Sequence, residues 1–192
     1  MEAAINSGAH PSPSDMFEIT VGDITTFDTD AIVNAAKSSL LGGGGVDGAI
    51  HKAAGPALLA ECCTLGGCPT GEAKITKAYR LPCKHVIHAV GPRVWGYEPT
   101  EENSEQLRSA YRNSLILANE HKCATVAFSS ISTGHFSFDP ALAAPIAVNE
   151  ILSFLYSPEN QYIKKVIMVC YTEDIKTFYD RALQDHCLRG TD

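Results

Sequence analysis

The sequence predicts an α/β fold, a three-layer α/β/α sandwich around a mostly parallel, mixed sheet. Short β-branched runs alternate with longer segments of helical periodicity, and this alternation is typical of a sheet covered by helices on both faces. The 192 residues fit one ordinary domain, which would bury about 70% of its unfolded surface. Because no internal repeat or low-complexity tract suggests a second unit, we expect a single domain over residues 15–192.

The expected elements follow one another along this domain. Strands are predicted at residues 17–21, 31–34, 74–79, 85–90, 125–128 and 165–170, where β-branched and aromatic residues cluster. Helices are predicted at residues 45–54, 56–65, 101–121, 140–156 and 174–187. In the longest helix, Leu107, Tyr111, Leu115 and Ala118 are spaced by three and four, so that helix should place one apolar stripe on the core.

The first residues of the chain read differently from the rest. Pro11 and Pro13 alternate with serines, and we expect residues 1–14 to form a disordered leader. This start has neither the basic nor the apolar region of a secretory signal, and no apolar run approaches the roughly 18 residues of a membrane span. The sequence therefore predicts a soluble protein without membrane attachment.

Net charge and cysteine content indicate which partners, which cellular compartment and which metals to expect. A formal net charge of -7 repels polyanions at long range, so no binding to a nucleic-acid backbone is expected. Seven scattered cysteines without a Cys-x-x-Cys pair do not form a disulfide framework, which predicts a reduced, intracellular protein, cytoplasmic or nuclear. A structural zinc is the competing interpretation. His85 and His88 lack cysteines at zinc-finger spacing, so no metal is expected.

A glycine-rich loop is the strongest functional feature. Four glycines, residues 42–45, follow a predicted strand and open a predicted helix that carries Asp47 and His51 at i, i+4. Backbone amides of such a loop, together with the helix dipole, favour phosphate or diphosphate. The spacing matches neither a P-loop nor a dinucleotide fingerprint. A flexible hinge is the alternative, but the loop lies between a strand and a helix rather than between domains.

The remaining candidate residues also follow predicted strands. Ligands of open α/β sheets bind outside the carboxyl ends of the strands. Asp23 follows the first strand, residues 130–138 follow the strand at 125–128, and Tyr171 follows the last strand. We therefore expect these segments to meet the glycine loop at one edge of the sheet.

The motifs together resemble a macrodomain of the MacroD type, a family that binds ADP-ribose and often hydrolyses ADP-ribosyl esters. The resemblance covers about residues 16 to 188, and its matching segments are residues 22–25, 34–36, 40–51, 53–56, 67–76, 86–92 and 130–134. It implies ADP-ribose as ligand and mono-ADP-ribosylated proteins as partners. No cofactor is implied, and the Cys and His ligands of zinc-containing macrodomains are missing from the glycine loop.

The resemblance assigns the adenine end of the ligand to three residues. Asp23 would accept a hydrogen bond from the exocyclic amine, with the backbone amide of Ile24 beside it, and Tyr171 would lie against the adenine face. The plainer alternatives are that Asp23 only stabilises a turn and that Tyr171 only packs.

Two loops would hold the diphosphate and the distal ribose. The residues concerned are Gly43, Gly44, Gly45 and Val46 in the glycine loop and Ser132, Thr133, Gly134, His135 and Phe136 in the second loop. Phe136 would form an apolar wall against the ribose, or would merely anchor its loop. The second loop departs from the family pattern, because Ser137 stands where glycine is common and Asp139 where proline is common.

The catalytic group implied by the resemblance comprises Asn34, Lys37, Asp47 and His51. Asn34 can donate to and accept from ribose hydroxyls, unless it is only a turn residue. Asp47 would orient or deprotonate the attacking water, although an acid at this position could simply favour the helix N-terminus. His51 would shape the pocket or serve as a packing residue.

Lys37 is the main departure, because the family usually has a second asparagine there. A lysine can donate but not accept, and beside Asp47 it would weaken that residue as a base; it could also grip a phosphate or point into solvent. The main hypothesis is hydrolysis of ADP-ribosyl esters, namely mono-ADP-ribosylated acidic side chains and O-acetyl-ADP-ribose. The alternatives are a non-catalytic reader of ADP-ribose or of ADP-ribosylated proteins, and a phosphatase acting on ADP-ribose 1''-phosphate.

Overall fold

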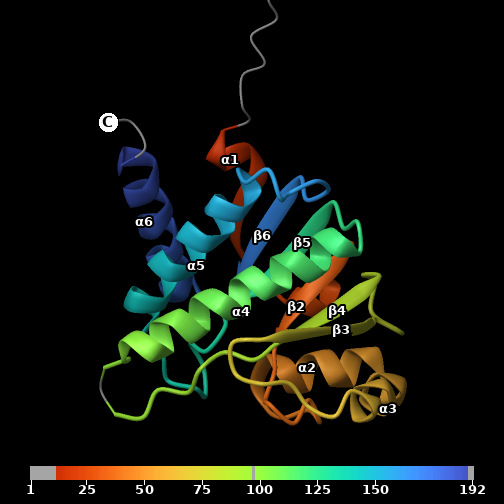
Figure 1. Cartoon of the computed structure of the whole chain (residues 1–192). Helices are drawn as coiled ribbons and strands as arrows, with labels where there is room; N and C mark the ends of the chain where they lie inside the picture. Colours follow the sequence, from red (N-terminus) through yellow and green to blue (C-terminus); the bar gives the residue numbers. More distant parts are fainter. Residues whose placement is uncertain (1–11, 97, 190–192) are drawn as a thin grey trace, which may run out of the picture.

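The structure, a computed structural model, describes residues 12–96 and 98–189 and shows the expected sandwich (Figure 1). Its sheet has six strands in the order β1-β6-β5-β2-β4-β3. Their bounds are β1 Phe17–Val21, β2 Ala31–Ala35, β3 Ala73–Lys77, β4 His85–Ala89, β5 Thr125–Ser129 and β6 Lys165–Cys170. Only the pairing of β3 with β4 is antiparallel. The predicted mixed, mostly parallel sheet is confirmed.

Helices cover both faces of this sheet (Figure 1). Their bounds are α1 Pro13–Met16, α2 Gly45–Ala54, α3 Pro56–Thr64, α4 Glu101–Glu120, α5 Pro140–Leu155 and α6 Glu173–Arg189, with a 3-10 turn η1 at Ile24–Thr26. Helices α4, α5 and α6 pack on one face and share its apolar core, while α2 and α3 bury theirs against the other. The predicted stripe of α4 is fully buried in the first of these cores.

The register of β2 and β4 divides neighbouring residues between the two faces. Val33 pairs with Ile87 and faces the core under α4, whereas Asn34 pairs with His88 one residue further on. Because side chains alternate along a strand, Asn34 and His88 share the face covered by α2 and α3. This pair brings two polar groups to the carboxyl edge of the sheet.

Element ends differ from the prediction by at most two residues, and one of the two-residue shifts has a physical reason. The strand expected at 74–79 ends at Lys77, because Tyr79 has a positive φ of 55° that cannot continue a strand.

The N-terminal segment also differs from the expectation. The expected leader at residues 1–11 lies outside the described part of the chain, but Pro13 begins the short helix α1. Ser12 and Asp15 form a capping box there, with the Ser12 hydroxyl donating to the Asp15 carboxylate over 2.7 Å. Met16 then enters the core with 8% of its surface exposed. Within the described residues, helical structure thus begins at Pro13, inside the segment that was expected to be disordered.

Two further observations concern the chain as a whole. In the described residues, none of the helices combines the length and the apolar character that crossing a membrane would require. All seven cysteines lie within those residues and are free thiols.

Candidate active site at the glycine loop

The glycine loop is built for close approach of neighbouring groups. A Cβ at Gly43 would lie 2.7 Å from Lys37 Cε and 3.1 Å from Asp47 Oδ2, so a larger residue there would require the Lys37 side chain to move. Helix α2 starts at the end of the loop with Gly44 as its N-cap, and no side chain caps it. The first backbone N–H groups of α2 therefore stay available to an external acceptor.

The second loop, residues 130–138, lies against the first. The His135 ring is 3.7 Å from the position that a Cβ of Gly44 would occupy and 3.5 Å from the same position at Gly45. The Ile131 N–H donates to the Tyr111 hydroxyl over 3.2 Å, which ties the base of this loop to α4. The two loops that the sequence placed at one edge of the sheet thus meet.

The loop's contacts show which side chains are engaged. The Thr133 hydroxyl bonds within the loop, to the Ser130 carbonyl at 3.0 Å and to the Ser130 hydroxyl at 2.9 Å. The Phe136 carbonyl accepts from the N–H of Val94 at 2.8 Å, and the Phe136 ring is half-buried. Gly134 is exposed, and a Cβ there would meet no atom within 4 Å.

Both departures of this loop from the family pattern have a local explanation. Ser137 has a φ of 59°, the left-handed conformation that glycine adopts without strain. Asp139 is the N-cap of α5 and accepts from the Ala141 N–H over 2.9 Å, while Pro140 occupies the first helical position. The loop therefore keeps the backbone that a glycine would favour and moves the proline by one residue.

Asn34, Asp47 and His51 form one group below the loops. The Asn34 side-chain amide donates to Asp47 Oδ1 over 2.7 Å, and His51 Nε2 lies 3.5 Å from the same oxygen. Asn34 and Asp47 are buried, at 0% and 4% exposure. The i, i+4 spacing on α2 thus brings the acid and the histidine together, and β2 supplies the amide.

Unpartnered polar atoms are concentrated at this edge of the sheet. Within residues 12–96 and 98–189, four buried side-chain nitrogen or oxygen atoms have no hydrogen-bond partner: Asn34 Oδ1, Asp47 Oδ2, His51 Nε2 and Ser132 Oγ. Leaving such atoms unpaired costs about 1–3 kcal/mol each. The cluster therefore indicates a place where a hydrogen-bonding ligand belongs.

Lys37 lies across the glycine loop. Its side chain is exposed. Its Nζ would lie 2.8 Å from a Cβ at Gly43, and Asp47 Oδ2 would lie 3.1 Å from the same Cβ. No salt bridge joins Lys37 to Asp47 in the part of the chain that is described. The amine thus reaches the neighbourhood of the acid without pairing to it.

The predicted adenine end lies where β1 and β6 finish. Asp23 caps η1, and its Oδ1 accepts from the N–H and the hydroxyl of Thr25 at 3.0 and 2.7 Å. Asp23 therefore does stabilise a turn, and both hydrogen bonds are accepted by its Oδ1. Tyr171 is 88% exposed, so the alternative that it only packs is wrong, whereas Ile24 is buried beside Asp23.

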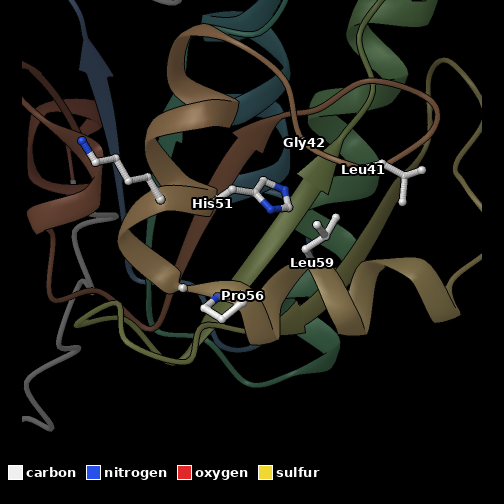
Figure 2. Close-up of a pocket in the computed structure, with 7 residues that line it drawn as sticks. Leu41, Gly42, His51, Pro56 and Leu59 are labelled. Atoms are coloured by element: carbon white, nitrogen blue, oxygen red, sulfur yellow. The ribbon is translucent and has the colours of Figure 1, made fainter.

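His51 also borders a cavity on the outer flank of the glycine loop. Figure 2 shows its imidazole extending from α2 between Gly42 and Leu59. This cavity of about 320 Å³ is lined by Leu41, Gly42, His51, Lys52, Gly55, Pro56 and Leu59. A second cavity of about 400 Å³, which also borders Leu41, reaches Cys62. His51 is thus contacted by Asp47 on one side and faces a surface cavity on the other.

Sequence reasoning missed the polar groups beneath the site. His88 bonds to Asn34 and Thr76, and Cys62 lies 3.7 Å from His88 Nε2. Burial, with the nearby His51, lowers the pKa of His88 to about 3, and burial raises the pKa of the Cys62 thiol to about 11. The one available signal was polar residues at inward positions of two apolar strands.

Potential metal ligands also gather here. Ligand atoms of His51, Cys62 and His88 lie within 4.8 Å of one another, the one such group among the described residues. They come from three separate elements, so spacing along the sequence could not reveal them. The expectation that no metal is bound stays a prediction.

Comparisons with known proteins agree with this architecture. The family model of the Macro domain matches residues 33–147. The Macro domain-containing protein of Methanosarcina mazei is 55% identical over 169 residues, which are 88% of each chain. The ADP-ribose glycohydrolase MACROD2 of Xenopus laevis is 49% identical over 85% of this chain, and the match covers 39% of that longer protein.

Solved structures show the same fold. The Oceanobacillus iheyensis macrodomain with ADP superposes with a TM-score of 0.83 at 40% identity, covering 93% of this chain and 96% of that chain. The Trypanosoma brucei macrodomain in complex with ADP-ribose gives a TM-score of 0.81 at 38% identity, covering 90% and 72%. Fold and site thus define an α/β/α protein with paired loops at the carboxyl edge of its sheet. The chain belongs to the Macro domain family, as the sequence motifs predicted.

Proposed function

We propose that this protein binds ADP-ribose and hydrolyses ADP-ribosyl esters, namely those of mono-ADP-ribosylated acidic side chains and of O-acetyl-ADP-ribose. The observation that carries the proposal is the set of buried, unpartnered polar atoms on Asn34, Asp47, His51 and Ser132. The naming of the Xenopus laevis relative as an ADP-ribose glycohydrolase and the ADP-ribose complex of the Trypanosoma brucei macrodomain support it.

The unpartnered atoms match the chemistry of a ribose. Asn34 Oδ1 and Asp47 Oδ2 are both hydrogen-bond acceptors, and a ribose supplies hydroxyl donors in adjacent positions. Binding would satisfy acceptors that burial otherwise leaves unpaired, so part of its free energy comes from relieving that cost. Ser132 Oγ can donate or accept and would serve the same sugar or the neighbouring phosphate.

The paired loops suit the diphosphate. The uncapped first turn of α2 offers backbone N–H groups beside Gly44, and the second loop faces them through His135. With a net charge of -7, the protein holds such an anion through local amides rather than a basic surface. Asp23 and the exposed Tyr171 would receive the adenine at the other end of the crevice.

Hydrolysis would centre on Asp47. A water beside Oδ2 would be oriented by the carboxylate, and its oxygen would attack the ester carbonyl or the anomeric carbon. Attack on the carbonyl breaks the bond between the acyl carbon and the oxygen that joins it to the ribose, whereas attack on the anomeric carbon breaks the bond between that carbon and the same oxygen. The water's proton passes to Asp47 or to the departing group, and the products are free ADP-ribose and a carboxylic acid. His51, 3.5 Å from Oδ1, would keep the carboxylate in place.

One observation favours the reader as a second candidate function. Lys37 crosses Gly43 toward Asp47, and a cation there would lower the basicity that the reaction needs. A reader would bind ADP-ribose or an ADP-ribosylated protein through the same loops but release nothing. We favour the hydrolase because Lys37 is exposed and unpaired with Asp47 among the described residues.

Two measurements test the proposal. Calorimetry should show one ADP-ribose bound per chain with a dissociation constant on the order of micromolar, or about 8 kcal/mol. Incubation with a glutamate-linked mono-ADP-ribosylated protein should release free ADP-ribose over time. If millimolar ADP-ribose produces no heat and no thermal shift, binding is ruled out. Binding without release of ADP-ribose would favour the reader.

A further inference from the structure

His88 lies directly beside Asn34 and is bonded on both ring nitrogens. The two residues are register partners on β4 and β2. Asn34 Nδ2 is 3.2 Å from His88 Nδ1, and Thr76 Oγ1 on β3 is 3.0 Å from His88 Nε2. All three side chains are buried. They extend the Asn34–Asp47 contact into an interior chain of hydrogen bonds, which we call the His88 chain (Asp47, Asn34, His88 and Thr76).

The direction of every bond in this chain follows from its ends. Asp47 Oδ1 can only accept from the Asn34 amide at 2.7 Å, so the NH₂ group of Asn34 must face it. The second hydrogen of that NH₂ group points to His88 Nδ1, which must then carry no proton. The ring proton of neutral His88 consequently sits on Nε2 and is donated to Thr76 Oγ1, whose own hydrogen reaches the Lys77 carbonyl at 3.0 Å.

These directions determine what the ligand meets. With both amide hydrogens used inside the chain, Asn34 presents only its oxygen, and that Oδ1 is one of the unpartnered atoms of the site. Rotation of the amide would place Oδ1 against the Asp47 carboxylate, where two acceptors repel. Burial lowers the pKa of His88 to about 3, so the ring stays neutral and keeps its role at ordinary pH.

We propose that His88 and Thr76 are positioning residues, which hold the Asn34 amide so that its nitrogen fixes Asp47 and its oxygen receives the ligand's ribose. Neither residue touches the ligand. The expected effect on turnover rests on the proposed function, but the effect on the hydrogen-bond directions does not. The inference also opposes metal binding at His51, Cys62 and His88. A metal on Nε2 would move the ring proton to Nδ1, against the Asn34 NH₂ group.

The first test measures the proton on His88 without reference to activity. Nitrogen NMR of the histidine side chains should show His88 with a protonated Nε2 and an unprotonated Nδ1, unchanged between pH 5 and 8. Thr76→Val keeps the shape and removes the acceptor of the Nε2 proton. Because the Asn34 NH₂ group still faces Nδ1, the tautomer should stay the same while the signal of the Nε2 proton shifts. A protonated Nδ1 in the wild type, or stoichiometric zinc that is lost in Cys62→Ser, would overturn the proposal.

The second test compares substitutions of His88. His88→Leu removes both bonds and should lower ADP-ribose affinity and single-turnover release by about tenfold, because misplacing a positioned group has effects of this order or larger. His88→Gln can still accept from Asn34 and donate to Thr76, so it should restore most of the loss. Cys62→Ala, 3.7 Å from His88 but outside the chain, should leave both quantities within about twofold.

Two outcomes separate this proposal from the hydrolase assignment. If the wild type binds ADP-ribose but releases none, affinity alone still reports on Asn34, and His88→Leu should still weaken it. If His88→Leu and His88→Gln lose affinity equally, the chain of hydrogen bonds does not position Asn34 and the proposal is wrong.

Discussion

Adjacent residues of β4 face two differently built interiors. Ile87 enters the core under α4 and α5, where its strand partner is Val33. His88, one residue further, enters the face under α2 and α3, where its partners are Asn34 and Thr76. The first interior can serve stability alone, because it is filled by apolar groups along these strands. The interior under α2 and α3 has polar groups instead of apolar packing at one edge, where they are positioned for a ligand.

The comparison shows on which side of β2 and β4 the unpartnered polar atoms lie. Along β2 and β4, the buried positions facing α4 are apolar (Ala31, Val33, Ile87 and Ala89), while the opposite side carries a hydrogen-bonded chain whose last acceptors lack donors.

Ile87→Ala should destabilise the protein by about 2–5 kcal/mol, because it leaves a cavity in a dry core. The loss should be nearly the same at pH 5 and pH 7.5, since no titrating group is exposed. Urea unfolding measures it, and Ile87→Val serves as a milder control with a cost of about 0.5–1.5 kcal/mol. A loss below 1 kcal/mol for the alanine variant would contradict the description of this core.

His88 should make the stability of the wild type fall in acid. Its folded pKa of about 3 lies below the usual 6.5, so below pH 6.5 the unfolded state binds the extra proton and the free energy of unfolding drops. By pH 5 the loss should reach about 2 kcal/mol relative to pH 7.5. The slope should fade near pH 3, where folded His88 also becomes protonated.

His88→Gln provides the comparison, because it lacks the titrating ring. Asp47, His51 and Cys62, which face His88, remain in both proteins, so subtracting the two stability curves isolates the histidine. Parallel curves between pH 7.5 and pH 5 would mean that His88 does not stay neutral in the folded state.

Asp23 can be tested at the far end of the crevice with a matched pair of variants. Asp23→Ala should weaken ADP-ribose binding by about 1–3 kcal/mol, because the adenine amine loses its acceptor. Asp23→Asn can keep an oxygen for the Thr25 bonds while presenting NH₂ to the adenine, so it should bind as weakly as Asp23→Ala with a smaller loss of stability. Wild-type affinity in Asp23→Asn would limit Asp23 to its turn role.

Ser137→Gly should stabilise the protein by about 0.5–1 kcal/mol, because the φ of 59° is free of strain for glycine. Thermal unfolding measures the change. Ser153→Gly, at an exposed position in the last turn of α5, is the control and should destabilise instead, since glycine is a poor helix former. Destabilisation by Ser137→Gly would show that the loop conformation is not strained.

Much of the fold could be predicted because local and global signals agree. The alternation of strands and helices predicted the layers, and glycines, prolines and caps placed the element ends within about two residues. The β3 boundary was missed because Tyr79 turns left-handed, a conformation that its residue type does not announce. The α1 helix was missed because proline and serine suggest disorder unless a capping partner such as Asp15 is considered.

The candidate site was predictable where its residues share a sequence motif or follow the carboxyl ends of predicted strands. The glycine loop, Asp47 and His51 are close in sequence, so their meeting follows from helix geometry. His88, Thr76 and Cys62 join them through strand register and helix packing, which a single sequence does not specify. Tyr111 was predicted only as a core residue, whereas its hydroxyl also anchors the second loop.

The proposal that Asp47 supports hydrolysis of ADP-ribosyl esters despite Lys37 depends on the buried polar groups at the carboxyl edge of the sheet. Single-turnover release of ADP-ribose from a glutamate-linked substrate, measured for the wild type, Asp47→Ala and Lys37→Asn, tests it most directly. We expect release by the wild type, release slowed about a hundredfold or more in Asp47→Ala with ADP-ribose binding retained, and release at least as fast in Lys37→Asn. A wild type that binds without release while Lys37→Asn turns over, or wild-type release that Asp47→Ala leaves unchanged, would contradict the claim.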